Sequence, residues 1–296
     1  NLTGVSTDTS AIENNIAILA FKTQSANDLA KFNLVDQVID EYKDGTGVTL
    51  TTAGQTGATA SAGYLSSIYN SGTAVPAGTV LLIHSDTTDA STTFTDSSTS
   101  AHTITAAGNA QHDTAQYHFG TSSILFDGSG DNLDTTAASS DWAFGTGDFT
   151  FAFWMRIAAA PGGTGVLIGN LDNVVVNNEW RMYIKTNRCL EMGSGAVHAT
   201  SVSAIPLDTW THVAATRSGT DLRFFINGTL DVTGTGYSAN LNQTHGIHIG
   251  NTLSAEYYNG WMDEIIVVKG TALWTSNFTV PTAAYAATVT SATGTA

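Results

Sequence analysis

Two aspartates flank a glycine-rich turn in the segment Phe126-Asp127-Gly128-Ser129-Gly130-Asp131. Calcium is a hard cation that favours carboxylate and carbonyl oxygens, and a turn of this composition presents both. The spacing therefore predicts a candidate calcium site that includes Asp127 and Asp131. A second interpretation stays open, because aspartates in such turns also accept hydrogen bonds from the backbone N–H groups of the turn itself.

Histidine and serine chemistry has less support from spacing. The closest pair among the eight histidines is His245 and His248. Residues three apart on a strand point to opposite faces, so these two do not chelate one metal ion together. Serine and aspartate are abundant enough to compose many Ser-His-Asp sets, but no Gly-x-Ser-x-Gly turn presents a nucleophilic serine. Nucleophilic hydrolysis is therefore not predicted.

Sugar recognition needs exposed aromatic side chains beside polar groups. The residues that offer this combination, and that form the candidate glycan-binding set, are Trp180, Tyr257, Tyr258 and Trp261. The competing interpretation is that each of these rings packs in a core, because aromatic side chains bury large apolar areas and dominate core packing.

The elements that position these residues are alternating strands. The segments Thr211 to Arg217 and Asp221 to Asn227 alternate in hydrophobicity and are joined by a Ser-Gly-Thr turn, which predicts an antiparallel hairpin. On the second strand Leu222, Phe224 and Ile226 share one face. A further segment places Phe149, Phe151, Phe153 and Met155 on one face, with Thr150, Ala152, Trp154 and Arg156 on the other.

This hairpin resembles the LamG-like branch of the concanavalin A-like lectin/glucanase superfamily, in which a Trp-x-His-Val-Ala strand precedes a strand that ends in Asn-Gly-Thr. The matching residues are Trp210-Thr211-His212-Val213-Ala214 and Asn227-Gly228-Thr229. Three further segments occur in the order that such domains show: Ser123 to Asp131, Asp148 to Met155 and Gly260 to Ile265. The resemblance implies a mainly β fold, an antiparallel two-sheet jelly-roll sandwich over residues 78–285.

The same resemblance bears on both metal and catalysis. It places the strand that carries Asp263 close to the turn of Asp127 and Asp131, which makes Asp263 a third candidate calcium ligand. The glucanases of the superfamily use a Glu-x-Asp-x-x-Glu strand whose carboxylates lie about 5 Å apart. Nothing in this sequence matches that pattern, and Asp263 and Glu264 are adjacent, so they are expected to point to opposite faces. We therefore expect no enzyme activity.

Charge and composition exclude several partners. The chain has 296 residues, with 10 basic against 25 acidic side chains, a net charge of −15. Such a surface repels nucleic acid and anionic membranes. The longest apolar run, Ile16 to Phe21, is far too short to span a bilayer. Cys189 is the only cysteine, which excludes an internal disulfide and leaves stability to packing or assembly.

The N-terminal part predicts a separate unit. Residues 1–48 carry two apolar stripes at helical spacing, which predict an α-helical assembly arm; its assembly residues are Ile12, Ile16, Leu19, Val35, Val38, Ile39 and Tyr42. A connector rich in Thr, Ala and Gly follows over residues 49–77, and residues 286–296 form a C-terminal tail. The arm either mediates assembly as a homo-oligomer or with other structural proteins, or folds back onto its own sandwich.

The arm also resembles segments that precede LamG-like domains in structural proteins of tailed bacteriophages, through Asn15 to Lys22 and Leu29 to Asp36. This resemblance implies a virion structural protein, such as a tail fibre, an appendage or a capsid decoration, which displays a lectin-like sandwich toward a host surface or glycan. The alternative is a secreted or cell-surface carbohydrate-binding module or adhesin, at an extracellular location. Beyond a possible calcium ion, no cofactor is expected.

Overall fold

The computed structural model describes residues 73–135, 138–170, 179–251 and 256–286. The predicted assembly arm and its seven residues, most of the connector and nearly all of the tail lie outside these ranges. Within the described part, no helix is long and apolar enough to cross a membrane.

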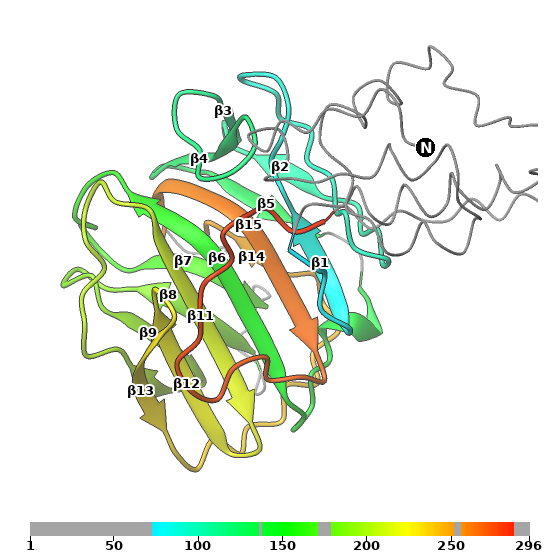
Figure 1. Cartoon of the computed structure of the whole chain (residues 1–296), viewed down its shortest axis with the longest axis vertical. Coiled ribbons are helices and arrows are strands. Elements are labelled where there is room, and N and C mark those ends of the chain that lie inside the picture. The colour runs from blue at the N-terminus through cyan, green and yellow to red at the C-terminus, as the bar shows by residue number, and fades with distance from the viewer. Residues whose placement is uncertain (1–72, 136–137, 171–178, 252–255, 287–296) are drawn as a thin grey trace, which may run out of the picture. The chain divides into compact units, whose positions relative to one another are not determined.

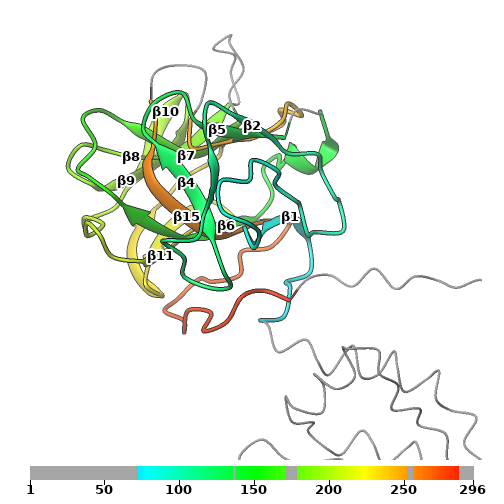
Figure 2. The ribbon, with the colours of Figure 1, turned by 90° about the horizontal axis from the view of Figure 1, so that it is seen from above.

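The described residues form two antiparallel sheets that pack face to face, as Figures 1 and 2 show from two directions. The eight-stranded sheet has the order β13 (Thr229–Gly234), β12 (Asp221–Ile226), β11 (Thr211–Ser218), β6 (Phe149–Ile157), β15 (Asn259–Lys269), β4 (Ser123–Asp127) and β3 (Gln111–Asp113), while β1 (Thr79–Ile83) also pairs with β15. The seven-stranded sheet has the order β10 (Ala196–Thr200), β9 (Leu190–Ser194), β8 (Trp180–Ile184), β7 (Gly165–Asn170), β14 (His248–Ile249), β5 (Asn132–Asp134) and β2 (Thr105–Ala107). One 3-10 turn, η4 (Ser140–Trp142), accompanies them. The predicted mainly β, two-sheet fold is confirmed, and the arrangement is consistent with a jelly-roll sandwich.

Alternation along β6 produces the core. Phe149, Phe151 and Phe153 point between the sheets, and Phe151 stacks on Trp180 of the opposite sheet with ring centroids 4.5 Å apart. The intervening residues Ala152 and Trp154 lie on the outer face. Successive side chains of a strand point to opposite faces, so a nine-residue strand with this pattern serves both a core and a surface. The predicted facing of this segment is confirmed.

The predicted hairpin forms as β11 and β12, and its next turn carries the chain into β13. Asn227 and Gly228 both have positive φ, +47° and +75°, as the tight turn between β12 and β13 requires. The Asn227 side chain accepts a hydrogen bond from the His212 backbone N–H at 2.9 Å, which ties this turn to the start of β11.

Strand β15 is central because it contacts three neighbours. Its first half pairs with β4 and its second half with β1, while β6 lies along its other edge. A register shift between Asp263 and Ile266 separates the halves, and Glu264 there has a φ of +50°. Core-facing Met262 and Ile265 are thus separated by two residues rather than one. The strict alternation behind the expected opposite facing of Asp263 and Glu264 therefore does not hold at this bulge.

The outer face of the eight-stranded sheet is partly covered by residues 271–286, which cross it in Figure 1. Phe278 contacts Phe225 edge to face, and Leu273 and Trp274 pack on the same small outer cluster. Thr73 pairs with Tyr285, so the described ends of the domain meet. Residues 73–77, expected in the connector, include this bridge and Val75, which packs on the outer cluster.

Candidate functional site

The glycine-rich turn uses its carboxylates on backbone groups. Asp131 is 1% exposed, and its two carboxylate oxygens accept hydrogen bonds from the N–H groups of Asp127 at 2.8 Å and Asn109 at 2.7 Å. Asp127 accepts one from the Ser129 N–H at 2.7 Å. These are the contacts of the turn interpretation, in which the aspartates satisfy local donors.

Asp263 does not join the two turn aspartates. Asp127 lies opposite Asn259 on β15, four residues before Asp263, a separation of about 13 Å along the strand. One Asp263 oxygen accepts from the N–H groups of His118 and Phe119 at 2.9 and 3.0 Å, and the other from Glu264 N–H. Burial raises the pKa of this carboxyl well above its usual value, whereas the two loop N–H donors act to lower it. No group of three or more His, Cys, Asp or Glu side chains able to hold a metal ion occurs among the residues described.

Asp263 instead anchors a loop that carries aromatic side chains. This loop, residues 114–122 between β3 and β4, brings His118 and Phe119 over Trp154 on the outer face of β6, and the exposed Tyr117 directly precedes them. The His118 ring stacks on Trp154 with centroids 3.5 Å apart and an interplanar angle of 23°. Trp210, just before β11, has its centroid 5.8 Å from that of His118. These five residues and Trp261 on β15 form what we call the outer aromatic face: Tyr117, His118, Phe119, Trp154, Trp210 and Trp261.

The outer aromatic face contains its own polar partners. The Arg156 guanidinium lies over the Trp261 ring at 5.1 Å, donates to the Gln116 side chain and lies 3.6 Å from the Asp208 carboxylate. The Trp261 indole N–H donates to the Asp113 carboxylate at 2.6 Å. The arginine charge is therefore balanced within the face, and the rings are held by neighbouring side chains before any ligand arrives.

Two histidines beneath and within this face are neutral at neutral pH. Burial lowers the pKa of His118 from 6.5 to about 4. Burial first, and the nearby His118 second, lower the pKa of His212 from 6.5 to about 3. The His212 ring lies 5.3 Å from Trp154 on the neighbouring strand. At neutral pH the face therefore presents uncharged imidazole next to indole.

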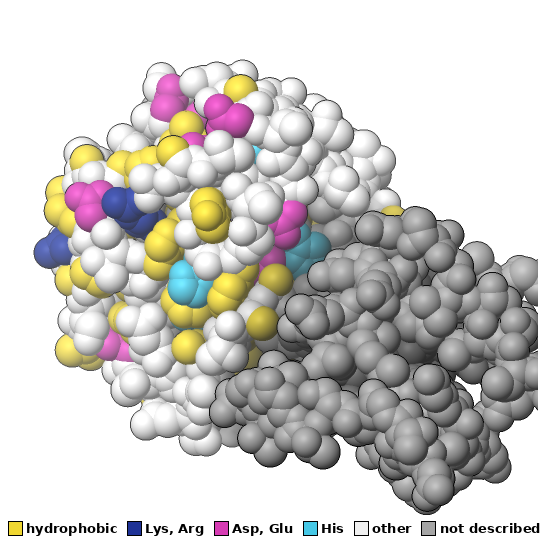
Figure 3. Space-filling model, turned by 45° about the horizontal axis from the view of Figure 1, so that its top comes forward, with side chains coloured by type: hydrophobic (Ala, Val, Ile, Leu, Met, Phe, Trp, Pro, Cys, Tyr) yellow, Lys and Arg dark blue, Asp and Glu magenta, His cyan; other side chains and the backbone are white. Residues whose placement is uncertain are grey.

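The face is accessible to solvent at its margin. Tyr117 is 48% exposed and Leu207, next to Asp208, is 38% exposed, while Trp154 is buried. Figure 3 shows hydrophobic and histidine side chains gathered on this side of the molecule. Four of the six tryptophans of the chain, Trp154, Trp210, Trp261 and Trp274, lie on this outer side rather than in the core between the sheets.

The four residues predicted to bind a glycan lie in different parts of the structure. Trp261 belongs to the outer aromatic face. Trp180 is 1% exposed and lies in the core between the sheets, so it cannot stack against a sugar. Tyr258 is also 1% exposed, and its hydroxyl lies 2.8 Å from the Arg156 carbonyl oxygen. Tyr257 and Tyr258 both line a small cavity at the rim of the sandwich.

Sequence reasoning missed Tyr117, His118, Phe119 and Trp210 as members of a surface. Trp154 was expected on a strand and Trp210 directly before one, but His118, which the loop brings to them, is 36 residues away from Trp154 along the chain. The one local signal was the run Tyr117-His118-Phe119 in an otherwise polar connection. Its position depends on Asp263, far later in the sequence, so no local pattern could place it.

Residues 127–273 match the family model described as the concanavalin A-like lectin/glucanases superfamily. The chain therefore carries a domain of this superfamily, as the sequence resemblance implied. No curated protein matches the sequence.

Solved structures show the same fold at low identity. The binding domain of Paraclostridial Mosquitocidal Protein 1 superposes with a TM-score of 0.51 at 15% identity, over 67% of this chain and 50% of that chain. The binding domain of Botulinum Neurotoxin DC, solved in complex with SialylT, gives 0.51 at 17% identity, over 66% and 49%. The same domain in complex with rat synaptotagmin II gives 0.50 at 16% identity, over 66% and 49%. The chain thus spans about half the length of these structures, and the likeness concerns the fold.

Proposed function

We propose that this protein is a non-enzymatic, lectin-like binding module whose outer aromatic face contacts a glycan. The observation that carries the proposal is the cluster in which His118 stacks on Trp154 beside Trp210, with Tyr117 exposed at its edge. Sugar rings pack their C–H groups on the electron-rich faces of aromatic rings, while polar groups nearby fix their orientation. Arg156 and Gln116 supply such polar groups.

Charge supports a sugar over other ligands. The chain carries a net charge of −15, and the Arg156 guanidinium is already paired with Asp208, so the outer aromatic face offers no unpaired arginine for a phosphate. The superfamily match and the binding domains that share the fold favour recognition over catalysis. Neither a carboxylate pair at glycosidase spacing nor a nucleophile motif was found in the sequence.

Truncating the half-buried Trp210 ring and the exposed Tyr117 ring tests the proposal. Trp210→Ala and Tyr117→Ala are expected to lower retention on a glycan array at least about tenfold, because ring truncation at a binding centre costs on the order of 2 kcal/mol. Thr220→Val, an exposed change in the turn at the far end of the β11–β12 hairpin, is the control. Unchanged retention by both ring variants, with melting temperatures preserved, would refute a glycan role for this face.

The more specific proposal is that the module is displayed on a bacteriophage particle, as part of a tail fibre, appendage or capsid decoration. Its support is the resemblance of residues 15–36 to segments of phage structural proteins. Immunogold electron microscopy of particles from the native source, with antibody against residues 73–286, should label virions. Label on the bacterial surface, with unlabelled virions, would favour the alternative of a cell-surface adhesin.

A further inference from the structure

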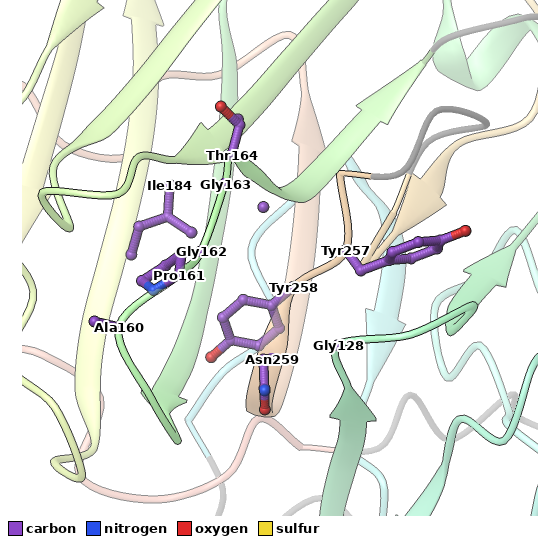
Figure 4. A pocket seen from close by; sticks show the side chains of 11 residues that line it. Gly128, Ala160, Pro161, Gly162, Gly163, Thr164, Ile184, Tyr257, Tyr258 and Asn259 are labelled. Atoms are coloured by element: carbon purple, nitrogen blue, oxygen red, sulfur yellow. The ribbon is translucent and has the colours of Figure 1, made fainter.

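A cavity of about 220 Å³ opens at the rim of the sandwich (Figure 4). At this rim β4 and β6 end, and β7 and β15 begin. One wall is the loop of residues 160–164 between β6 and β7, and the other is formed by Tyr258, Asn259 and Gly128. Figure 4 shows the rings of Tyr257 and Tyr258 pointing in different directions, so only one of them can face the loop.

Three glycines of the loop, Gly162, Gly163 and Gly165, line this cavity. A methyl group added at Gly162 or Gly163 would meet no other atom within 4 Å, so these positions border empty space. Gly165 differs, because a methyl group there would lie 3.2 Å from the Tyr257 carbonyl oxygen and 3.3 Å from Ile184. The loop therefore combines a tightly packed base at Gly165 with an open tip at Gly162 and Gly163, where a larger side chain is not expected to disturb the fold.

The lining is uncharged. It consists of Gly, Ala, Pro, Ile, Thr, Tyr and Asn residues, with no acidic or basic side chain. The Tyr258 hydroxyl lies 2.8 Å from the Arg156 carbonyl oxygen and 3.2 Å from that of Trp261, and burial raises its pKa. The polar groups that remain for a ligand are the exposed Asn259 amide, the Thr164 hydroxyl and the backbone. Such a lining suits hydroxyl groups and disfavours a carboxylate or sulfate, which would lose its water without gaining a cation.

The cavity continues the outer aromatic face. Asn259 and Trp261 are two residues apart on β15, so both point to the outer side of the sheet, about 7 Å apart. Arg156, which covers the Trp261 ring, is joined through its carbonyl to Tyr258 of the cavity wall. A chain-like ligand on the aromatic rings would reach the cavity by passing Trp261.

We propose that the cavity receives the uncharged terminal sugar of the glycan that lies on the outer aromatic face, and so selects glycans by their end. This inference rests on the proposed glycan function of that face. The cavity is smaller than the roughly 300–1,000 Å³ of sites for drug-sized ligands, so it takes one end unit rather than a branch. Recognition at the end explains why a neutral pocket adjoins an extended aromatic surface.

A glycan array of matched pairs tests the proposal. Each pair shares one neutral chain, and one member is capped at its end by sialic acid or sulfate. The full-length protein is expected to retain uncapped members at least about tenfold better than capped ones, and Gly163→Val should remove most of that retention. Gly162→Ala, a smaller filling change, should weaken it less, and Thr220→Val should leave it unchanged.

The outcomes separate the two proposals. If Trp210→Ala abolishes retention while Gly163→Val and end capping have no effect, the face binds glycans and the cavity proposal is wrong. If capped and uncapped members are retained equally, selection by an uncharged end is wrong. If the native protein retains no member of any pair, both proposals fail. Melting temperatures of each variant, expected to match the native protein within a few degrees, exclude misfolding as the cause.

Discussion

His212 is a buried histidine that the fold holds neutral. Its pKa falls from 6.5 to about 3 on folding, so the unfolded chain binds a proton in the interval between these values and the folded chain does not. The contribution of neutral His212 to the free energy of unfolding is therefore fully present above about pH 6.5, and it is lost as the pH falls toward 3. Between pH 6.5 and 4 the loss is about 3 kcal/mol.

Urea unfolding at about pH 7 and about pH 4.5 measures this effect. His212→Gln is expected to be less stable at pH 7, because the replaced ring packs against Trp154, but to lose less stability on acidification. The matched control is His245→Gln, which makes the same substitution at an exposed histidine. An identical pH slope in the native and His212→Gln proteins would contradict a neutral buried imidazole.

Asp263 is a positioning residue for the outer aromatic face. Its carboxylate accepts the His118 and Phe119 N–H groups, so Asp263→Asn replaces an accepting oxygen with an amide nitrogen beside these donors or beside Glu264 N–H. We expect a loss of about 1–3 kcal/mol in the free energy of unfolding, together with weaker glycan retention. Asp127→Asn, in an exposed turn position, should change neither by a comparable amount. Full stability and retention in Asp263→Asn would show that the loop is held by other contacts.

Calcium binding stays a prediction from the sequence. The melting temperature is expected to rise on adding calcium, and the rise to shrink in Asp127→Ala. Asp263, which the sequence also suggested, lies about 13 Å along β15 from the residue opposite Asp127 and is no longer part of this candidate site. Scanning calorimetry with calcium and with excess chelator measures this directly. The same melting curve in both would leave only the turn interpretation, with which the backbone hydrogen bonds of Asp127 and Asp131 agree.

At the scale of strands, the Asn227-Gly228 turn joins β12 to β13 under two constraints. Gly228 has a φ of +75°, and a methyl group there would lie 2.1 Å from the Phe278 carbonyl oxygen. A left-handed backbone conformation alone costs a residue with a side chain about 1 kcal/mol. Gly228→Ala is therefore expected to lower the free energy of unfolding by more than this, on the order of 2–4 kcal/mol. Urea unfolding measures the loss.

Gly219→Ala is the matched control for this turn. Gly219 also has a positive φ, +60°, but a methyl group there meets no atom within 4 Å. The control thus isolates the backbone cost, and the excess in Gly228→Ala reports the contact with residues 271–286. Equal losses in the two variants would mean that the C-terminal segment yields to the added methyl group without cost.

Strands were predictable from the sequence where alternation is unbroken. The period of two in Phe149 to Met155 and in Leu222 to Ile226 determined which side chains face the core, because both strands lie inside a sheet with one buried face. Alternation gave a wrong prediction at Asp263 and Glu264, which were expected on opposite faces, because one extra residue is inserted in β15 at this point. This bulge lies where the neighbour of β15 changes from β4 to β1, and the local sequence does not predict that change.

At the scale of the molecule, the site was less predictable than the fold. The outer aromatic face combines a loop at Tyr117, a strand at Trp154, a strand entry at Trp210 and a strand at Trp261, which only the sheet order brings together. Of these residues, only Trp261 was in the glycan-binding set predicted from the sequence. Trp180 was selected for the same chemistry and lies in the core, because composition does not report which face of β8 a ring occupies.

The predicted assembly role of residues 1–48 also belongs to the whole molecule. The sequence predicts two apolar stripes there, and apolar area left in water costs on the order of 25 cal/mol per Å², so the prediction requires another surface to cover the stripes. Deleting residues 1–48 is expected to leave the sandwich folded, because its described core and both sheets are built from residues after 72. Sedimentation should then show a mass that falls to the monomer.

Thermal unfolding distinguishes assembly from the alternative that the arm covers its own sandwich. Under assembly, the shortened chain unfolds at a temperature that no longer depends on protein concentration, whereas the full chain unfolds at a higher temperature as concentration rises, because association stabilises by mass action. If both chains are monomers and deletion lowers the melting temperature sharply at every concentration, the stripes are buried within one chain and the assembly role is wrong. Docking onto a different structural protein leaves both chains monomeric with equal melting temperatures, and loss of incorporation into the parent particle then identifies it.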